Sequence, residues 1–573
     1  MNKFLIISFS LLFLYSCAET DNDFNINIPS TSEVETLIEH SKEFEKTVLS
    51  YDTPGGKIHF AIGFGIANSI MVEGENGNII IDAADSVYEA EQIYSLFSEK
   101  NNNPIKAIIY THNHGDHTFG AAYYVKSQNE KPQIIAHEDT DYYVQRIMGI
   151  LNPIITSRST RMFGTSLPEK DVINVGIGPN LSVSKSPTGY VRPDTTFSDT
   201  LKLNIEGIEL ELYHAPGETN DQIFVWLPKH KALMPGDNIY KTFPNLYTIR
   251  GTTHRDVKGW IDSIDHMKTF EPEYLFPSHT KPIIGKETIQ DALNIYRDAI
   301  QYIHDQTIRL MNQGLYPDEI ADIVKLPKEI AESPYLYEFY GTVRWSVKSI
   351  FNGYLGWFSG NPSELDPLSR REKALRISDL AGGNDMLLEK LRFAVKEKDM
   401  QWALELSDYL ISLDLFTDEV KELRIEALIY EGSRSSNPNK RNYFLTSAFE
   451  LNGNVEDISL LDRTSEDLLH HISIDTLFDV LSTRFNPEEE FDNNYKVCFS
   501  FSSGIQKNIT IRNKVAVISN NIDGNCDLKI ISEEIEFKKT LTGLSSPVAQ
   551  IASGDLIVEG SSSEFLIFLS KFR

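Results

Sequence analysis

The spacing of apolar and polar residues changes along this chain of 573 residues, and the changes divide it into segments. Between about 55 and 285, short apolar runs such as Ile105–Tyr110 alternate with longer helical stretches. Apolar runs of four to eight residues are typical of buried strands. The alternation of strands and helices therefore predicts an α/β domain over residues 55–285.

Residues 286–455 show helical periodicity and few strand signals. Ile289–Met311 predicts one long amphipathic helix, because its apolar residues recur at the spacing of a single helix face. Glu389–Leu413 and Asp418–Tyr430 predict a helical hairpin or solenoid. We expect an all-α domain over residues 286–455.

Residues 456–573 include stretches with the period-two alternation of half-buried strands. Four strands are predicted there: Tyr495–Phe501, Lys507–Arg512, Lys514–Ser519 and Cys526–Ile531. Helical segments flank them, Ser465–Arg484 before and Glu533–Thr542 after. The pattern predicts a C-terminal α+β domain.

The N-terminus combines a short basic start with the apolar stretch Phe4–Tyr15, which predicts a secretory signal over residues 1–17. The stretch is shorter than the roughly 20 apolar residues that span a bilayer. Ser16-Cys17 resembles a bacterial lipobox, so we expect Cys17 to become the lipidated first residue of an exported lipoprotein. Its location would be the outer membrane, on the periplasmic or the cell-surface face. A plain signal peptide with an incidental cysteine is the alternative.

A polar tether and one helix are expected over residues 18–54. The tether covers 18–31. Ser32 and Glu35 have the spacing of a capping box, which predicts a helix that begins there and ends near Val48.

Composition narrows the partners of the chain. The formal net charge of −28 argues against nucleic acid, because phosphate binding requires a basic face. The hydrophobic content of 41% suffices for packed cores and is too low for a membrane protein. Besides Cys17, the chain has Cys498 and Cys526. Export would permit a disulfide between them, and two buried thiols are the alternative.

Four side chains that suit metals follow the apolar run at 105–110: His112, His114, Asp116 and His117. Neutral imidazole nitrogens and carboxylate oxygens are what Zn²⁺ binds. His112 and His114 are alternate residues of an extended segment and point the same way, so they can bind one ion. Asp116 and His117 fall past the turn and can face a second ion.

This spacing resembles the H-x-H-x-D-H signature of the metallo-β-lactamase superfamily. The resemblance implies an αββα sandwich with the metals at one edge between two sheets. Asn68–Asp82 looks like the opening of that fold, with Asp82 supporting the metal loop through hydrogen bonds.

Three later motifs resemble the remaining ligand positions. His214–Asn220 resembles the second motif, with Glu218 where many superfamily hydrolases have histidine, and His214 is the rival ligand. Glutamate at this position resembles the linear alkylsulfatases. Asp237, in Met234–Asn238, is the expected bridging acid, although alkylsulfatases usually carry Glu there. His279 is the expected last ligand.

The resemblance implies a dinuclear centre that shares Asp237 and a water or hydroxide between two cations. One cation would be held by His112, His114 and Glu218, the other by Asp116, His117 and His279. The mixed ligands suit two Zn²⁺ ions, with Mn²⁺ or Fe²⁺ as alternatives. Two such cations about 3.5–4 Å apart activate water, which indicates a hydrolase.

A second stretch indicates the substrate. Asn245–Thr252 closely resembles the alkylsulfatase segment that binds the sulfate group, and Asn245 and Arg250 match it. Arginine presents a planar set of donors that fits an oxyanion. Arg255 is also basic in the family. Tyr190 falls where the family places an aromatic residue lining the site, and a packed loop tyrosine is the alternative.

Two further phrases resemble alkylsulfatases. Tyr340–Trp345 and Gly353–Pro362 are nearly the same in the helical region of that family, which it uses for dimerisation, so a homodimer is implied. Ile551–Gly560 is similar to part of the family's sterol-carrier-protein-like C-terminal domain.

Our hypothesis is a lipid-anchored, dinuclear zinc alkylsulfatase that converts small amphiphilic sulfate esters to alcohol and inorganic sulfate. Metal-bound hydroxide would attack, and Asp237, Asn245 and Arg250 would be catalytic. Tyr190 and Arg255 would help bind the substrate. The alternatives are another hydrolase of the same fold (thioesterase, lactonase or phosphodiesterase) and a non-catalytic lipid-binding surface lipoprotein.

Overall fold

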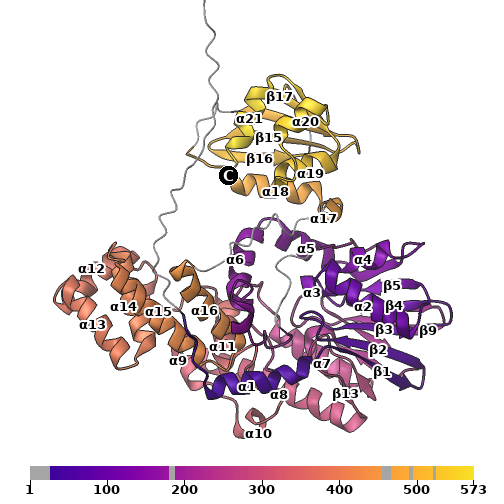
Figure 1. Ribbon diagram of the computed structural model, residues 1–573, viewed down its shortest axis with the longest axis horizontal. Helices are drawn as coiled ribbons and strands as arrows, with labels where there is room; N and C mark the ends of the chain where they lie inside the picture. The colour runs from indigo at the N-terminus through magenta and orange to yellow at the C-terminus, as the bar shows by residue number, and fades with distance from the viewer. Residues whose placement is uncertain (1–25, 180–186, 454–465, 489–493, 521–523, 573) are drawn as a thin grey trace, which may run out of the picture.

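The structure is a computed structural model, and it describes residues 26–179, 187–453, 466–488, 494–520 and 524–572 (Figure 1). The predicted signal peptide with Cys17, and the tether as far as residue 25, lie outside these ranges. In the ranges described, no helix is both long and apolar enough to cross a bilayer.

Two mixed β-sheets form the centre of the first part of the chain. The first has the order β1 (Thr47–Thr53), β2 (Gly56–Ile62), β3 (Ser69–Glu73), β4 (Asn78–Ile81), β5 (Ile105–Ile109), β6 (Gln133–His137) and β7 (Thr195–Phe197). The second runs from β13 (Ile283–Ile284) through β12 (Tyr274–Leu275), β11 (Ala232–Met234), β10 (Ile223–Leu227) and β9 (Ile208–His214) to β8 (Thr200–Ile205).

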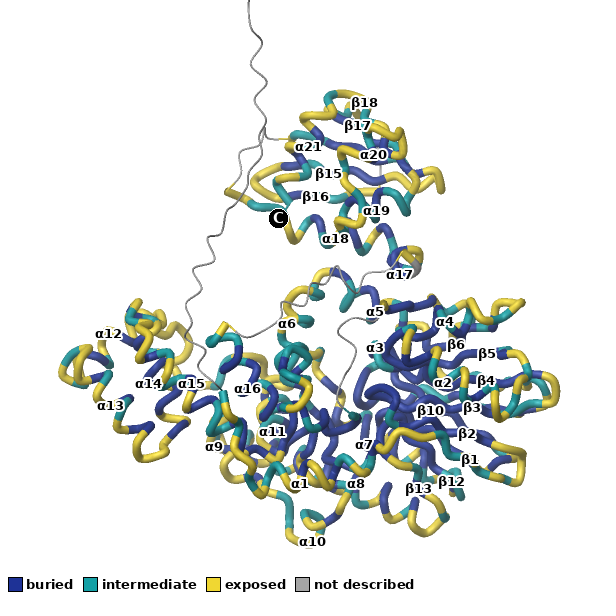
Figure 2. Tube along the Cα trace, viewed as in Figure 1, coloured by how far each residue is buried: buried dark blue, intermediate teal, exposed yellow. Residues whose placement is uncertain are grey.

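The two sheets pack face to face, and helices cover their outer faces. Ile79 and Ile81 point into the core between the sheets, whereas Ile80 joins the core under the helices, as strand alternation requires. Helices α2 (Val87–Lys100) and α4 (Ala121–Lys126) cover the first sheet, and α7 (Val257–Lys268) and α8 (Lys286–Met311) cover the second. Figure 2 shows this core as the most deeply buried part of the molecule. The predicted αββα sandwich is confirmed.

Helix α8 confirms the predicted amphipathic helix, and it packs both against α7 of the sandwich and against the later helices α9 (Pro317–Ile323) and α11 (Val343–Leu355). Its buried residues, such as Leu293 and Ile300, share one core with Trp260 of α7. Helix α8 thus links the sandwich to the helical region, and the boundary at residue 286 stays a prediction.

The predicted N-terminal helix is shorter than expected. Helix α1 (Ser32–His40) is capped by the Thr31 side chain, which accepts from the Val34 amide, not by Ser32. Its continuation toward Val48 fails because Val48 lies on β1, opposite Ala61 of β2. Pairing with a distant strand overrides the local helical signal.

The helical region follows α8. Its elements are α9 (Pro317–Ile323), α10 (Lys328–Ala331), α11 (Val343–Leu355), α12 (Arg370–Ala381), α13 (Asn384–Lys396), α14 (Met400–Ser412), α15 (Asp418–Ser433) and α16 (Pro438–Asn452). The segment expected as one helix over Glu389–Leu413 is divided between α13 and α14. Helix α16 packs against α6 (Asn152–Phe163) of the sandwich, which ties the two parts together (Figure 1).

The C-terminal part is an α+β unit with a five-stranded sheet. The sheet order is β16 (Val515–Ser519), β15 (Gln506–Arg512), β14 (Tyr495–Phe501), β17 (Leu528–Ser532) and β18 (Leu556–Glu559). The helices are α17 (Glu466–His471), α18 (Ile474–Arg484), α19 (Glu534–Thr542), α20 (Pro547–Ser553) and α21 (Ser562–Ser570). Cys498 and Cys526 form a disulfide, which decides the alternative left open by the sequence. Leu468 and Ile472 join the core under the first sheet, so this unit docks on the sandwich.

Candidate active site

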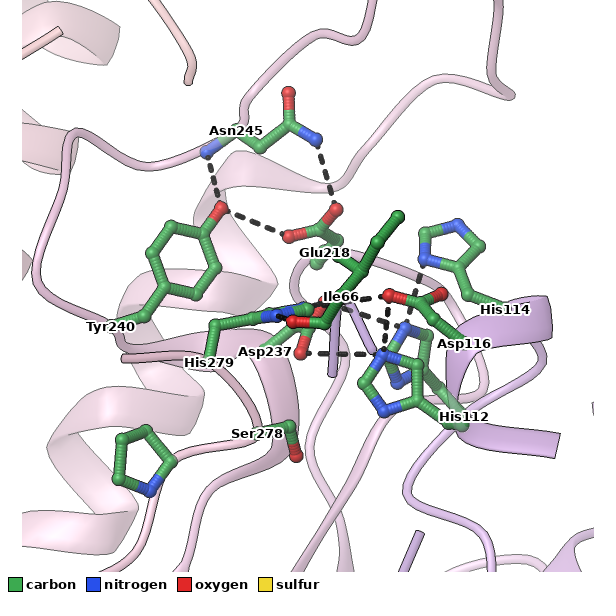
Figure 3. A network of polar contacts seen from close by, with 12 residues as sticks. Ile66, His112, His114, Asp116, Glu218, Asp237, Tyr240, Asn245, Ser278 and His279 are labelled. Carbon is green, nitrogen blue, oxygen red and sulfur yellow. Dashed lines mark hydrogen bonds and ion pairs between the residues drawn. The ribbon is translucent and has the colours of Figure 1, made fainter. Parts of the chain in front are cut away.

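Four segments that follow strands bring the predicted metal ligands to one edge of the sandwich (Figure 3). His112 and His114 follow β5, and Asp116 and His117 lie on the short helix α3 (Gly115–Thr118). Glu218 lies between β9 and β10, Asp237 follows β11, and His279 follows β12. Strand ends that meet at one edge converge naturally, so residues far apart in sequence become neighbours.

The candidate ligands form three overlapping groups, and within each the ligand atoms lie no more than 4.8 Å apart. The groups are His112, His117 and Asp237; Asp116, His117 and His279; and His114, Glu218 and Asp237. Asp237 occurs in two groups, and its Oδ2 lies 3.1 Å from His279 Nε2 and 3.6 Å from His112 Nε2. The carboxylate thus lies between the two sides of the cluster, as expected of a bridging ligand.

The polar atoms of the cluster fit divalent cations. His117 Nε2 and Asp237 Oδ1 are buried, have no hydrogen-bond partner and lie 3.6 Å apart. Such orphaned atoms are costly in a folded protein. Imidazole nitrogens together with the carboxylates of Asp116, Glu218 and Asp237 are a suitable donor set for divalent metals. Cations between these atoms would satisfy them and balance the carboxylate charge.

The electrostatics of the cluster point the same way. Burial, reinforced by the charge of His117, lowers the pKa of His112 well below its usual range, and burial does the same for His114. Both rings are therefore neutral, which is the form that binds metals. Burial also lowers the pKa of His279, but Asp237 raises it to a net value of about 9. The negative charge of Asp237, which favours a proton on His279, would equally favour a metal cation at this position.

Asp82 supports the metal loop after β5 through hydrogen bonds, as the sequence predicted, and it also binds the loop after β12. Its Oδ2 accepts from Ser278 Oγ at 2.7 Å and Thr111 Oγ1 at 3.0 Å, and lies 2.8 Å from His117 Nδ1. The residue has a left-handed φ of 61°, which aspartate tolerates better than most residues. These hydrogen bonds hold that conformation and leave His117 Nε2 pointing at the cluster.

Glu218 is fixed by three side chains, two of which the sequence assigned to the substrate. Arg255 Nη1 lies 3.0 Å from Glu218 Oε1, and the Asn245 amide donates to the same oxygen at 2.9 Å. Tyr240 donates to Oε2 at 3.1 Å (Figure 3). Arg255 is almost fully buried and lines neither cavity described below, so its contact here is with Glu218, and its contact with substrate stays a prediction.

His214, the rival ligand, turns away from the cluster. Its Nε2 lies 2.7 Å from the carbonyl oxygen of Asn220, and its ring stacks on His137 at 4.1 Å. None of the candidate ligand groups among the described residues includes it. Glu218 is the member of this motif that reaches the cluster.

Arg250 reaches the cluster from its open side. Its Nη2 lies 3.0 Å from His114 Nε2, and the side chain lines a cavity of about 680 Å³. Asp116, Glu218 and Asp237 line the inner end of this cavity, and Tyr340 also lines it. The position suits a guanidinium that binds an oxyanion next to the metals.

The cavity continues away from the metal cluster as an apolar chamber. Its walls come from α5 (Thr140–Met148) and α6 on one side and α18 and α19 on the other. Ile147, Ile155, Leu477, Leu481 and Leu541 are among the lining residues. The C-terminal unit therefore completes the chamber, which the sequence did not reveal.

Tyr190 does not contribute to this surface. It is fully buried, donates to Asp141 Oδ1 at 3.0 Å and packs near Tyr110 and His471. It lines neither cavity, so its packing favours the alternative of a packed loop tyrosine.

Sequence reasoning missed Tyr240 and Asp85. Tyr240 stands two residues beyond the Met234–Asn238 motif, and that proximity is the only signal for it. Asp85 is buried, lines the large cavity and accepts from the Ile66 amide at 2.7 Å. Burial, with the charge of Asp116, raises the pKa of Asp85 well above its usual value.

The sandwich and its ligand cluster define a domain of the metallo-β-lactamase superfamily, with two further domains after it. Residues 62–279 match the family model described as metallo-beta-lactamase superfamily. Residues 316–454 match the model described as alkyl sulfatase dimerisation, and residues 462–573 match alkyl sulfatase C-terminal. The three matches together indicate the alkyl sulfatases, whereas the first domain alone indicates only the superfamily.

Similar proteins agree with this combination. A linear primary-alkylsulfatase of Pseudomonas sp. (strain ATCC 19151) is 34% identical over 518 residues, which cover 88% of this chain and 98% of the relative. An (R)-specific secondary-alkylsulfatase of Pseudomonas sp. is 26% identical over 80% of this chain and 71% of its own. The structure of an inverting sec-alkylsulfatase from Pseudomonas sp. superposes with a TM-score of 0.84, at 23% identity, over 92% of this chain and 84% of that one. The chain belongs to the linear alkylsulfatase family.

Proposed function

We propose that this protein hydrolyses linear alkyl sulfate esters to an alcohol and inorganic sulfate, with two zinc ions in its active site. One observation carries the proposal: Arg250 lies 3.0 Å from His114, at the junction of a complete ligand cluster and an apolar chamber. A site for the sulfate group, a metal site and an apolar chamber for the alkyl chain thus lie next to one another. The relative named linear primary-alkylsulfatase supports the same reaction.

Each part of the substrate has a matching surface. The guanidinium of Arg250 would bind two oxygens of the sulfate group. Side chains such as Leu477, Leu481 and Leu541 would surround the alkyl chain, and each buried methylene contributes about 0.8 kcal/mol. An amphiphilic ester therefore fits better than a polar one.

When bound, the two cations would supply Lewis-acid chemistry, activating water and neutralising charge on the ester. Asp237 would hold both, because its Oδ2 lies 3.6 Å from His112 of one ligand set and 3.1 Å from His279 of the other. Glu218 would hold one, with its orientation fixed by Arg255, Asn245 and Tyr240. Asn245 would then act through Glu218, since its amide already donates to that carboxylate.

We propose zinc because the histidine and carboxylate donors suit it, and Mn²⁺ or Fe²⁺ are the competing ions. Metal analysis of the purified protein decides among them. Restoring activity to metal-depleted protein with each ion separately gives an independent answer. Two equivalents of zinc per chain are expected.

We also propose that the chain forms a homodimer through its helical region. The matched dimerisation model supports this, and so does the exposure of large apolar side chains there. Trp357 is 73% exposed, Leu380 on α12 is 83% exposed and Phe393 on α13 is 63% exposed. Apolar surface of this kind is typical of a face that meets a partner.

For location, we propose an exported lipoprotein anchored through Cys17 to the outer membrane. The Cys498–Cys526 disulfide supports export, because such bonds persist in oxidising compartments. Labelling with a fatty-acid analogue tests the anchor. It should label the wild type and not Cys17→Ala.

A panel of dodecyl sulfate, a dodecyl thioester and a lactone at fixed Zn²⁺ tests the reaction. The proposal expects release of inorganic sulfate and at least a hundredfold preference for the sulfate ester. Preference for the thioester or lactone would identify another hydrolase of the fold, and binding without turnover would identify a lipid-binding protein.

A further inference from the structure

A second, smaller cavity adjoins the site on the other side of Arg250. Its volume is about 220 Å³, and it shares Asn113, His114, Ile147, Ile155 and Arg250 with the large cavity. Thr252, one of its lining residues, is exposed to solvent. Arg250 and His114 therefore stand between two chambers rather than at the end of one.

The charges on the two sides of Arg250 differ in sign. Three arginines line the small cavity, Arg146 on α5, Arg158 on α6 and Arg250, and no carboxylate residue lines it. The large cavity has four carboxylates at its metal end, Asp85, Asp116, Glu218 and Asp237, and besides Arg250 its one other arginine is Arg484 of α18. Three guanidinium groups without an acid are unexpected in a chain of net charge −28. We call this cavity the cationic chamber.

Arg146 has no structural partner to explain its position. Among the described residues it makes no hydrogen bond or ion pair, and its side chain is only partly exposed. Arg158, in contrast, donates from Nη2 to the carbonyl oxygen of Ile249 at 2.6 Å, which braces the segment that carries Arg250. One arginine thus supports the wall and the other is free to bind.

Hydrolysis of an alkyl sulfate separates an apolar alcohol from an inorganic dianion. The dianion cannot leave favourably through the apolar chamber, because an unpaired charge next to apolar side chains costs several kcal/mol. The cationic chamber offers it guanidinium donors, and Thr252, Thr253 and Asn220 add polar groups. Charge-assisted hydrogen bonds of this kind are the strong ones.

We propose that the cationic chamber is a second oxyanion site, which binds the inorganic sulfate released by the reaction and passes it to solvent. The identity of the anion as product rests on the proposed function. The site itself does not, since it is defined by Arg146, Arg158 and Arg250. The alcohol leaves by the apolar chamber, so the two products take separate paths.

Calorimetric titration of the metal-loaded protein with sodium sulfate tests the site without turnover. Arg146→Gln should weaken sulfate binding about tenfold, the equivalent of losing one charged hydrogen bond. Arg146→Lys, which keeps the charge, should weaken it less. Arg309→Gln removes an exposed arginine on α8 and should bind as the wild type does. Sodium phosphate in place of sulfate shows whether the chamber distinguishes the two anions, and tighter binding of phosphate would overturn the assignment to sulfate.

Kinetic measurements distinguish a site for released sulfate from a site for the sulfate group of the substrate. For Arg146→Gln, inhibition by sulfate should weaken about tenfold while the KM for dodecyl sulfate rises less than threefold. An equal rise in KM would overturn the proposal, because Arg146 would then bind the substrate's own sulfate group. Wild-type affinity for sulfate in Arg146→Gln would also overturn it. If dodecyl sulfate is not hydrolysed at all, the proposed function fails, and the titration still decides the anion site.

Discussion

Arg255 Nη1 lies 3.0 Å from Glu218 Oε1, and both side chains are almost completely buried. Among the described residues, Glu218 is the one carboxylate of the candidate ligand set that pairs with a guanidinium. The guanidinium of Arg255 offsets the negative charge of Glu218, which lies close to the carboxylates of Asp116 and Asp237. This contact also distinguishes Arg255 from Arg250, which faces the cavity.

Arg255→Met should therefore reduce stability and metal content together. Removing one partner of a buried pair leaves an uncompensated charge and costs about 3–5 kcal/mol. Urea unfolding and metal analysis measure the two effects. If Arg255→Met loses sulfatase activity with normal stability and full metal content, Arg255 serves the substrate and the positioning role is wrong.

Arg250→Ala, unlike Arg255→Met, should reduce activity without reducing metal content. Because its guanidinium faces the cavity beside His114, we expect full metal content and a loss of roughly 100-fold in kcat/KM for dodecyl sulfate. A chromogenic ester without a sulfate group, assayed in parallel, should lose much less. Unchanged turnover of dodecyl sulfate would remove Arg250 from the sulfate site.

Asp82→Asn should lower metal affinity by about 10–100-fold, because Asp82 orients His117 without reaching the cluster itself. Competition with a chelator, followed by metal analysis, gives the affinity. Asp52→Asn, an exposed change in β1, is the control. Equal metal affinity in wild type and Asp82→Asn would show that the ring of His117 is held by its other contacts.

The loop of His112 and His117 could be predicted because it follows the apolar run Ile105–Tyr110, whereas Glu218 and Asp237 were identified by the resemblance of their motifs to those of the family. The sequence could not predict the partners of Asn245 and Arg255, since a basic or amide residue suits a sulfate group and Glu218 equally. Tyr190 shows the same limit: the resemblance placed an aromatic residue near the site, but burial and its bond to Asp141 decide where it points.

The errors in secondary structure have a similar origin. Val48 belongs to β1 because its partner Ala61 is supplied by β2, which no local pattern reveals. The apolar chamber was not foreseen because its walls come from α5 and α6 on one side and α18 and α19 on the other. Period-two alternation did locate β14, whose bounds Tyr495–Phe501 match the prediction.

His471, between the C-terminal unit and the sandwich, should make stability depend on pH. Burial, together with the nearby cations Lys131, His470 and Arg192, lowers its pKa to about 4 from the usual 6.5, and Asp141 opposes this only in part. The unfolded chain then binds the proton first as pH falls, so stability is full above pH 6.5 and declines toward pH 4.

Comparison with His471→Gln isolates that contribution from the carboxylates that titrate in the same range. Between pH 7 and pH 4 the wild type should lose about 1–2 kcal/mol more than the variant, a value reduced because the ring is only half-buried. Urea unfolding at several pH values measures the difference. Parallel curves for the two proteins would contradict the assignment.

Narrowing the apolar chamber should shorten the preferred substrate. Val480 of α18 lines the chamber, so Val480→Trp should exclude the distal methylenes of a dodecyl chain and leave room for a hexyl chain. Since each buried methylene contributes about 0.8 kcal/mol, losing two or more should lower the ratio of kcat/KM for dodecyl to hexyl sulfate at least tenfold. Val515→Trp, at an exposed position of β16 in the same unit, should keep the wild-type ratio. An unchanged ratio in Val480→Trp would mean that the alkyl chain leaves the metal cluster by another path.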